Sequence, residues 1–416
     1  MAHEFFSDER KTAYLNQRGA HLPLISPVDA AVLNRARLYR LGRLRAQMDI
    51  HDVSALLLYD PVNIRYAFDS SNMQVWTLHN PMRYALILNN GPALMFEFQG
   101  CEHLNNGLPG ISETRPSKAW NYMVMGDKAD QALANWADEI NDLVRSTGYA
   151  NLRIAADRLD TAGTHALEER GLVCVAGDAI TERARSIKSA DELELMRWTI
   201  RVCEAGMARI YENSVPGVTE RELWAHLHFE NARSGGDWLE TKLLTCGPNT
   251  NPWYQECSDR PCQAGEMISF DTDMIGPYGY CADLSRSWTC GYTAFSPTQR
   301  RLYDTALDQI HHNLALLEPG LPFREFNDKS WRIPEKHLDY RYSLALHGVG
   351  MADEWPAIWL QPDWDDTQTT EGQFEEGMVV CVESLIAEQG SESIKLETQV
   401  LITADGAKRL DSFPWE

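Results

Sequence analysis

The chain has 416 residues, of which 44% are hydrophobic and 24% charged, a balance typical of a folded globular protein rather than a disordered one. Its 38 basic and 60 acidic residues give a net charge of −22, which disfavours nucleic acids and anionic membrane surfaces as partners. Because single hydrophobic cores stop growing at about 250 to 300 residues, we expect two domains.

The first half of the chain alternates helical patterns with short apolar runs typical of strands. Helices are expected over residues 30–50 and 130–148, and strands over residues 54–59, 84–89, 153–157 and 172–177. This alternation predicts an α/β (α+β) fold. A charged stretch near residues 183–188 ends the pattern, so we place one domain at residues 1–185 and a second at residues 186–416.

The second half opens with two helix start signals. Ser189 precedes Glu192 by three residues, and Thr219 precedes Glu222 in the same way; both pairs have the form of a capping box. After the first pair, apolar residues recur at helical spacing up to Ile210. Strand patterns replace the helical ones after about residue 265, so the polar residues below fall in strand contexts.

The nine cysteines include no CxxC pair, and the spacing of Cys257 and Cys262 is too loose for a zinc knuckle. We therefore expect reduced, buried thiols. Residues 1–19 contain no basic segment followed by an apolar core, and no run approaches about 18 apolar residues. The expected location is the cytoplasm.

Three aspartates lie in the segment FDTDMIGPYGYCADLSRSW. Asp271 and Asp273 are two apart on a predicted strand, so both side chains should leave the same face. A three-residue loop at residues 277–279, ending in a left-handed glycine, would place Asp273 opposite Asp283. A four-residue loop would instead place Asp283 opposite Thr272.

Two glutamates and a histidine add to this set. MVVCVESL is an apolar strand that ends at Glu383, and the alternation in SIKLETQVLIT puts Lys395, Glu397 and Gln399 on one face. His347 lies in the turn-like HGVG. Each acid alone fits a solvent-facing strand residue, and the histidine alone fits a turn or a core position.

Taken together, the acids and the histidine predict a site for two bridged divalent metals, because carboxylates and imidazole are suitable ligands. Without cations, clustered carboxylates would raise one another's pKa and destabilise the fold. The candidate ligands are Asp271, Asp273, Asp283, His347, Glu383 and Glu397.

These motifs resemble the pita-bread metallopeptidase family, which includes aminopeptidase P, prolidase, methionine aminopeptidase and creatinase. RLGRLRAQMDIHDVSALLLYDPVNIRYAF resembles a creatinase-type N-terminal domain, and SIKSADELELMR resembles the start of the catalytic domain. Within the family, FDTDMIGPYGYCADLSRSW and HGVGMADEWP are most similar to the dimethylsulfoniopropionate lyases. That resemblance implies two divalent transition-metal ions, with iron as the metal, Asp273 as an extra ligand, and a homodimer. Such a site also accepts zinc, manganese or cobalt.

The chain departs from the peptidase pattern at three places. Thr272 stands where peptidases carry their first metal-binding Asp, and Trp253-Tyr254 stand where they carry His-Tyr. Asp353-Glu354 replace the downstream histidine of the HGxGxxxHE pattern. Because peptide hydrolysis uses those two histidines to hold the amide carbonyl and its oxyanion, these departures disfavour a peptidase.

The resulting hypothesis is a metal-assisted β-elimination of dimethylsulfoniopropionate to dimethyl sulfide and acrylate, with Asp353 as general base and Glu354 as the alternative. Aromatic faces bind onium groups, and those nearest the motifs are Trp253, Tyr254, Tyr342 and Trp355, although each could equally fill a core. The rival functions are an X-Pro aminopeptidase or prolidase-like metallopeptidase, and a non-catalytic pita-bread binding module.

Overall fold

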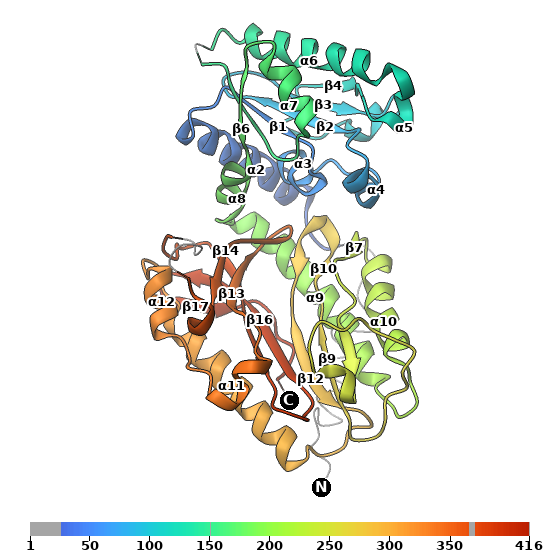
Figure 1. Cartoon of the computed structure of the whole chain (residues 1–416), viewed down its shortest axis with the longest axis vertical. Helices are drawn as coiled ribbons and strands as arrows, with labels where there is room; N and C mark the ends of the chain where they lie inside the picture. Colours follow the sequence, from blue (N-terminus) through green and yellow to red (C-terminus); the bar gives the residue numbers. More distant parts are fainter. Residues whose placement is uncertain (1–25, 150, 366–370, 416) are drawn as a thin grey trace. The chain divides into compact units, whose positions relative to one another are not determined.

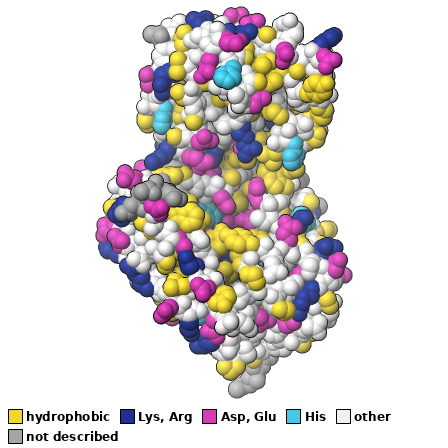
Figure 2. Space-filling model, viewed as in Figure 1, with side chains coloured by type: hydrophobic (Ala, Val, Ile, Leu, Met, Phe, Trp, Pro, Cys, Tyr) yellow, Lys and Arg dark blue, Asp and Glu magenta, His cyan; other side chains and the backbone are white. Residues whose placement is uncertain are grey.

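The computed structural model describes residues 26–149, 151–365 and 371–415. Residues 1–19, in which no secretion signal is expected, lie outside the described part. The chain divides into two compact units, an N-terminal unit of residues 29–185 and a C-terminal unit of residues 186–416 together with residues 26–28 (Figure 1). On the face drawn in Figure 2, acidic and basic side chains are interspersed over each unit.

The N-terminal unit is built around a six-stranded mixed sheet with the strand order β4-β3-β2-β1-β5-β6. Strands β1, β2 and β3 pair antiparallel, and the β3–β4, β1–β5 and β5–β6 pairs are parallel. The strands are β1 (Ala55–Leu58), β2 (Tyr84–Leu88), β3 (Ala93–Glu97), β4 (Glu113–Pro116), β5 (Arg153–Ala156) and β6 (Val173–Ala176). The helices are α2 (Ala30–Ile50), α3 (Pro61–Phe68), α4 (Gln74–His79), α5 (Tyr122–Met125), α6 (Ala129–Ser146), α7 (Thr161–Glu168) and α8 (Asp178–Arg185).

Local sequence explains these elements. The Asp29 carboxylate accepts a hydrogen bond from the Ala31 amide and so caps α2, which covers the helix expected over residues 30–50. Helix α6 buries Trp136, Ile140 and Val144, spaced four apart, in the core that it shares with β1 and β2. The α/β pattern expected for this half is confirmed.

The C-terminal unit contains three antiparallel sheets, with the orders β11-β10-β7, β12-β9-β8 and β14-β13-β15-β16-β17. Its helices are α9 (Ala190–Glu212), α10 (Glu220–Arg233), α11 (Pro297–Leu316) and α12 (Phe323–Lys329). Its strands are β7 (Trp238–Leu239), β8 (Leu244–Cys246), β9 (Met267–Asp271), β10 (Met274–Ile275), β11 (Cys281–Ala282), β12 (Ser285–Thr289), β13 (Leu344–Val349), β14 (Asp353–Trp359), β15 (Val379–Ile386), β16 (Ile394–Thr403) and β17 (Gly406–Arg409).

Two hydrophobic cores flank the strands of this unit. Helices α9 and α10 pack on β8, β9 and β12, whereas α11 and α12 pack on β13, β15 and β16 (Figure 1). Side chains join the β12-β9-β8 sheet to the five-stranded sheet. Ser269 Oγ donates a hydrogen bond to Ser393 O at 2.7 Å, and Ser287 Oγ donates one to Lys395 O at 3.0 Å. Both start signals predicted for this half are confirmed as capping boxes, at α9 and α10.

The hairpin that carries the aspartates agrees in part with expectation. Met274 pairs with Ala282 and Ile275 with Cys281, and Gly279 has φ +76°, so the three-residue loop is correct and the four-residue loop is not. The continuous strand through Asp271 and Asp273 is wrong. Asp273 has φ +35°, which breaks the ladder between β9 and β10.

Two further expectations need correction. Cys246 and Cys262 form a disulfide with Cα atoms 5.7 Å apart, so reduced thiols are not found throughout; the other seven cysteines are free. The sequence separation of 16 residues gives no sign of this pairing, which follows from the path of the chain between β8 and β9. In addition, β15 does not end at Glu383 but continues to Ile386.

Candidate metal centre

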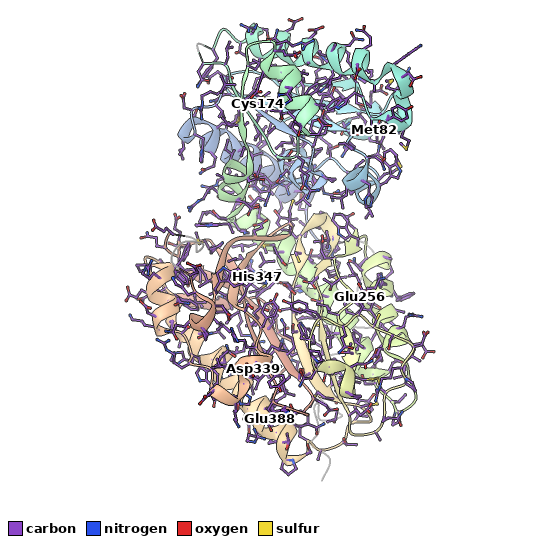
Figure 3. All side chains as sticks on the ribbon, in the orientation of Figure 1. Met82, Cys174, Glu256, Asp339, His347 and Glu388 are labelled. Atoms are coloured by element: carbon purple, nitrogen blue, oxygen red, sulfur yellow. A yellow bond between two sulfur atoms is a disulfide. The ribbon has the colours of Figure 1, made fainter. Side chains whose placement is uncertain are left out.

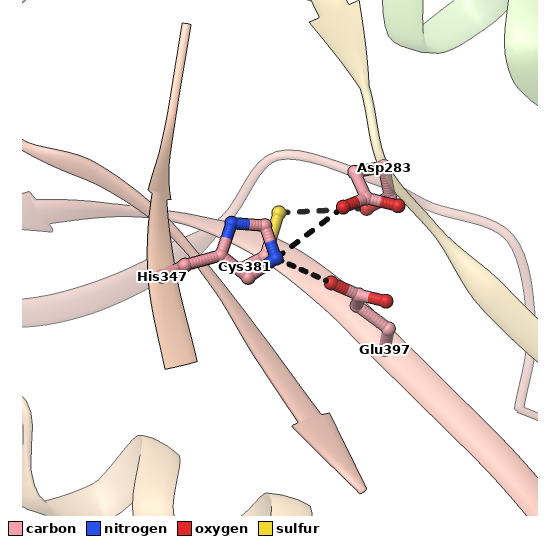
Figure 4. Close-up of side chains that lie close together, drawn as sticks. All are labelled: Asp283, His347, Cys381 and Glu397. Carbon is pink, nitrogen blue, oxygen red and sulfur yellow. Dashed lines mark hydrogen bonds and ion pairs between the residues drawn. The ribbon is translucent and has the colours of Figure 1, made fainter. Parts of the chain in front are cut away.

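Five of the six predicted ligands gather in the C-terminal unit as two overlapping groups of potential ligands, and Glu383 belongs to neither group. Ligand atoms of Asp271, Asp273 and Asp283 lie within 4.8 Å of one another. A second group, with atoms equally close, consists of Asp283, His347, Cys381 and Glu397 (Figure 4). Asp283 belongs to both groups, so the geometry suits two neighbouring cations.

Strand register explains why residues from three strands meet. Glu383 on β15 lies directly opposite Glu397 on β16, and His347 on β13 lies opposite Cys381 on β15. Directly opposed residues of antiparallel strands point to the same face, as do residues two apart on one strand. The side chains of His347, Cys381, Glu383 and Glu397 therefore share one face.

His347 turns one ring nitrogen toward the carboxylates. Its Nε2 lies 3.4 Å from Asp283 Oδ2, 3.4 Å from Glu397 Oε1 and 3.8 Å from Glu383 Oε1. Its Nδ1 lies 3.0 Å from the carbonyl oxygen of Gly348. A proton held on Nδ1 by that carbonyl leaves Nε2 as the atom that can ligate a metal.

Lys395 is a central residue of the site to which the sequence assigned no role. Its ammonium lies 2.9 Å from Asp271, 2.9 Å from Glu383 and 2.7 Å from Glu397, and its side chain is fully buried. Its place on the same strand face as Glu397 was visible in the alternation of β16. The three contacts were not visible, because two of the carboxylates come from other strands.

Burial and mutual repulsion dominate the electrostatics of the cluster. Burial raises the pKa of Glu383 to about 8. Burial together with Glu397 and Asp271 raises the pKa of Asp283 well above its ordinary value. Burial acts in the same direction on Glu397, but Lys395 and His347 overcome it and hold the pKa of that carboxyl below its ordinary value.

The cluster has the properties of a cation site. Five carboxylates face one lysine and one histidine, which leaves excess negative charge in a buried place. Among the described residues, no hydrogen-bond donor reaches Asp283 Oδ1 or Glu383 Oε1, although both oxygens are buried. Carboxylate oxygens with one imidazole fit divalent transition metals.

Cys381 also faces this cluster, although it is not among the ligands predicted from the sequence. Its Sγ lies 3.6 Å from the carbonyl oxygen of Asp283, and its side chain is buried. The signal that could have revealed it is its position two residues before Glu383 on a strand, which places both side chains on one face. It is a thiol among hard oxygen donors.

The two candidate bases have different surroundings. Asp353 Oδ1 lies 3.7 Å from His347 Nδ1, and the Asp353 side chain is 59% exposed. Glu354 is buried, where it lies 3.0 Å from Lys188 Nζ and accepts a hydrogen bond from the Met351 amide at 2.9 Å. Only Asp353 lies beside the cluster and is open to solvent.

The four candidate aromatic residues are not equally close to the cluster. The rings of Tyr254 and Tyr342 lie 5.7 Å apart, and Lys395 Nζ lies 5.3 Å from the centre of the Tyr342 ring. Trp253 is half-buried in the same loop as Tyr254. Trp355 packs at 5.3 Å against Phe323 in the core beside α12.

Comparison with known proteins identifies the family. Residues 194–404 match the model of metallopeptidase family M24. The chain belongs to this family. It is 39% identical over 390 residues to dimethylsulfoniopropionate lyase DddP of Roseovarius nubinhibens, which covers 92% of this chain and 87% of the relative. The DddP of Roseobacter denitrificans is 38% identical over 397 residues, covering 94% of this chain and 88% of the relative.

Solved structures show the same fold. The Xaa-Pro dipeptidase from Bacillus anthracis matches with a TM-score of 0.73 at 19% identity, covering 91% of this chain and 99% of the other. The prolidase from Pyrococcus furiosus matches with a TM-score of 0.69 at 20% identity, covering 88% and 99%. The expected pita-bread fold is thereby confirmed, and these likenesses carry the fold alone.

Membership in M24 places the acidic cluster in a family that depends on divalent metals, typically at binuclear sites. Metal binding by this M24 protein therefore agrees with both its family and its donor set. No helix in the described part of the chain combines the length and the apolar character needed to cross a bilayer.

Proposed function

We propose that this M24 protein is a dimethylsulfoniopropionate lyase that releases dimethyl sulfide and acrylate. The observation that carries the proposal is the 39% identity to a DddP lyase along 92% of the chain. The M24 peptidases are more distant, since the Xaa-Pro dipeptidase of Pyrococcus furiosus is 25% identical over 56% of the chain. A carbon–sulfur lyase is thus favoured over the X-Pro peptidase that the fold alone would suggest.

Two divalent metal ions fit the cluster, and we propose iron as the metal. When bound, such cations supply Lewis-acid stabilisation of negative charge that develops on a substrate carboxylate. The residues that would hold them are Asp271, Asp273, Asp283, His347, Glu383 and Glu397. Lys395 adds a fixed positive charge beside Asp271, Glu383 and Glu397.

Asp353 is the proposed general base. It takes a proton from the carbon next to the substrate carboxylate, and the electron pair of that C–H bond forms the new carbon–carbon double bond. The carbon–sulfur bond breaks with its electrons on sulfur, so dimethyl sulfide and acrylate leave and the proton stays on Asp353. Glu354 is the weaker candidate, because it is buried in an ion pair with Lys188.

The sulfonium group cannot donate a hydrogen bond, so we assign it to aromatic faces. Tyr342 and Tyr254 are the best placed, because their rings are paired and the contact of Tyr342 with Lys395 places this ring beside the carboxylate cluster. Trp253 shares the loop of Tyr254 and replaces a histidine of the peptidase pattern, which favours an onium group over an oxyanion. Trp355 is the least favoured of the four, since its ring packs against Phe323.

We further propose that residues 1–185 form the creatinase-type N-terminal domain and residues 186–416 the pita-bread catalytic domain. A homodimer in the cytoplasm is proposed from the family resemblance, with no role for nucleic acid or membranes. Light scattering coupled to gel filtration tests the dimer: a mass near 47.2 kDa, that of one chain, would contradict it.

Headspace gas chromatography tests the function. Purified, metal-replete protein mixed with dimethylsulfoniopropionate should release dimethyl sulfide, and the Asp283→Ala variant should release none. A panel of X-Pro dipeptides run beside it should stay uncleaved. Absence of gas with cleavage of the peptides would overturn the lyase in favour of a peptidase. Absence of both, together with no bound metal, would favour a binding module.

A further inference from the structure

The segment between β8 and β9 forms a covalently closed loop. Its ends are joined by the Cys246–Cys262 disulfide, and apart from the short 3-10 helix Gly247–Thr250 its residues adopt no helix or extended strand. Trp253 and Tyr254, two of the aromatic residues proposed to bind the sulfonium group, lie near the middle of this loop. The disulfide therefore encloses part of the proposed substrate site.

The base of the loop is fixed by a buried carboxylate. Glu220, at the start of α10, accepts hydrogen bonds from the Cys246 amide at 2.9 Å and the Ser258 amide at 2.9 Å. It also accepts from Asn249 Nδ2 at 3.0 Å and Ser258 Oγ at 2.6 Å. The Glu220 side chain thus connects the outgoing arm of the loop, residues 246–251, to the returning arm, residues 257–262.

The outgoing arm is also attached to the turn between β15 and β16. Asn251 Nδ2 donates to Ser391 O at 2.8 Å, and the Ser393 amide donates to Thr250 Oγ1 at 2.9 Å. On the returning arm, the Cys257 amide donates a hydrogen bond to Lys242 O at 2.8 Å. These anchors hold both arms of the loop at residues that directly flank its tip.

The tip of the loop, residues 252–256, is attached more weakly. Within the described residues its polar contacts are a hydrogen bond from Gln255 to Pro252 O, an ion pair of 3.7 Å between the exposed side chains of Lys242 and Glu256, and a hydrogen bond between the side chains of Tyr254 and Tyr342. Tyr254 is 64% exposed, and its side chain meets the site through Tyr342. The two arms of the loop therefore set the position of the tip.

We propose that the Cys246–Cys262 disulfide is a redox-sensitive positioning element that holds Trp253 and Tyr254 for onium binding. This inference rests on the proposed function for the identity of the substrate. A cross-link removes conformations from the loop, so its loss lets the tip spread over positions that do not meet Tyr342. Metal binding and the base lie outside the loop and keep their geometry.

The redox step is a simple exchange. Dithiothreitol reduces the disulfide to two cysteine thiols and is itself oxidised to its cyclic disulfide. Both cysteines are fully buried, so this reaction needs a transient opening of the loop. In the proposed cytoplasmic location, thiols are ordinarily kept reduced, and a disulfide found there usually responds to the redox state of the cell.

Mass spectrometry tests whether the cross-link exists in solution. The full-length protein is denatured and alkylated with iodoacetamide, with and without prior reduction. Without reduction, Cys246 and Cys262 should stay unmodified while the control Cys257, which lies in the same loop, is alkylated. Alkylation of Cys246 and Cys262 in unreduced protein would overturn the proposal.

A variant without the cross-link tests its role and needs no access by reductant. Cys246→Ala combined with Cys262→Ala should speed hydrogen exchange of the 250–257 peptide by about tenfold. It should also raise KM for dimethylsulfoniopropionate about tenfold while kcat and metal content stay unchanged. Cys257→Ala should change neither quantity.

The outcomes separate this inference from the proposed function. Faster exchange with raised KM supports it, whereas unchanged exchange, or a fall in kcat at constant KM, refutes it. If the protein released no dimethyl sulfide at all, the proposed function would fail. The exchange measurement would then still decide whether the disulfide positions the loop.

Discussion

Asp353 Oδ1 lies 3.7 Å from Nδ1 of His347, and the two side chains connect solvent to the carboxylate cluster. His347 is buried and turns its other ring nitrogen to Asp283 and Glu397, whereas the Asp353 side chain is 59% exposed. A small carboxylate substrate held at the cluster would therefore present its neighbouring carbon close to Asp353.

Replacement of Asp353 by Asn should remove the base and leave the rest of the site in place. We expect kcat to fall by about 10²- to 10⁴-fold, the range that a general base contributes. Metal content, measured by plasma mass spectrometry, should match that of the wild type. Activity within a few-fold of wild type would show that another group takes the proton.

Replacement of Glu354 by Gln should affect stability more than chemistry. The change leaves the buried Lys188 ammonium without its charged partner, at a cost of about 1 to 3 kcal/mol in the free energy of unfolding. Urea denaturation followed by circular dichroism measures this loss, with exposed Glu376→Gln as the control. If Glu354→Gln instead abolished turnover in folded protein, Glu354 would replace Asp353 as the base.

Loss of Asp283 should disturb both potential metal positions, because its carboxylate belongs to both ligand groups. We expect the wild type to hold about two equivalents of divalent metal per chain and Asp283→Ala to hold less than one. Asp339→Ala is the control, because Asp339 is exposed on the 3-10 helix Glu335–Tyr340 (Figure 3). Equal metal content in all three proteins would place the cations elsewhere.

The aromatic face of Tyr342 should contribute to binding of the sulfonium group. Tyr342→Leu removes the ring, and we expect KM to rise about 2- to 30-fold, which corresponds to the energy of a cation–π contact. Tyr342→Phe keeps the ring and should leave KM close to that of the wild type. Steady-state kinetics of both variants decides the point, since an equal rise in both would assign the effect to the hydroxyl.

Removal of the metals should abolish activity reversibly. We expect a chelator such as dipicolinic acid to stop release of dimethyl sulfide, and added ferrous iron to restore it. Readdition of manganese, zinc or cobalt in parallel tests the metal, because this donor set accepts all of them. Full activity of a chelated protein that contains no metal would exclude a metal-assisted elimination.

Much of the site could be predicted from local sequence, because side chains two residues apart on a strand point to the same face of the sheet. The capping boxes at Ser189 and Thr219 and the three-residue loop at residues 277–279 also depend on neighbouring residues alone. The left-handed Asp273 could not be predicted in this way. Its backbone carbonyl accepts a hydrogen bond from the distant Glu240, a contact made by the fold.

Long-range features were missed for the same reason. The ammonium of Lys395 reaches carboxylates on β9 and β15, and the disulfide joins cysteines that the chain brings together only after folding. The choice between Asp353 and Glu354 also needed the structure, since adjacent residues differ in direction and only the path of β14 decides which one faces Lys188.

We propose that the protein eliminates dimethyl sulfide from dimethylsulfoniopropionate without adding water. Proton NMR of the reaction mixture, combined with headspace gas chromatography, measures both products of one reaction. We expect acrylate and dimethyl sulfide in equal amounts from the wild type and neither from Asp283→Ala. Formation of 3-hydroxypropionate in place of acrylate, or no reaction by metal-replete protein, would contradict it.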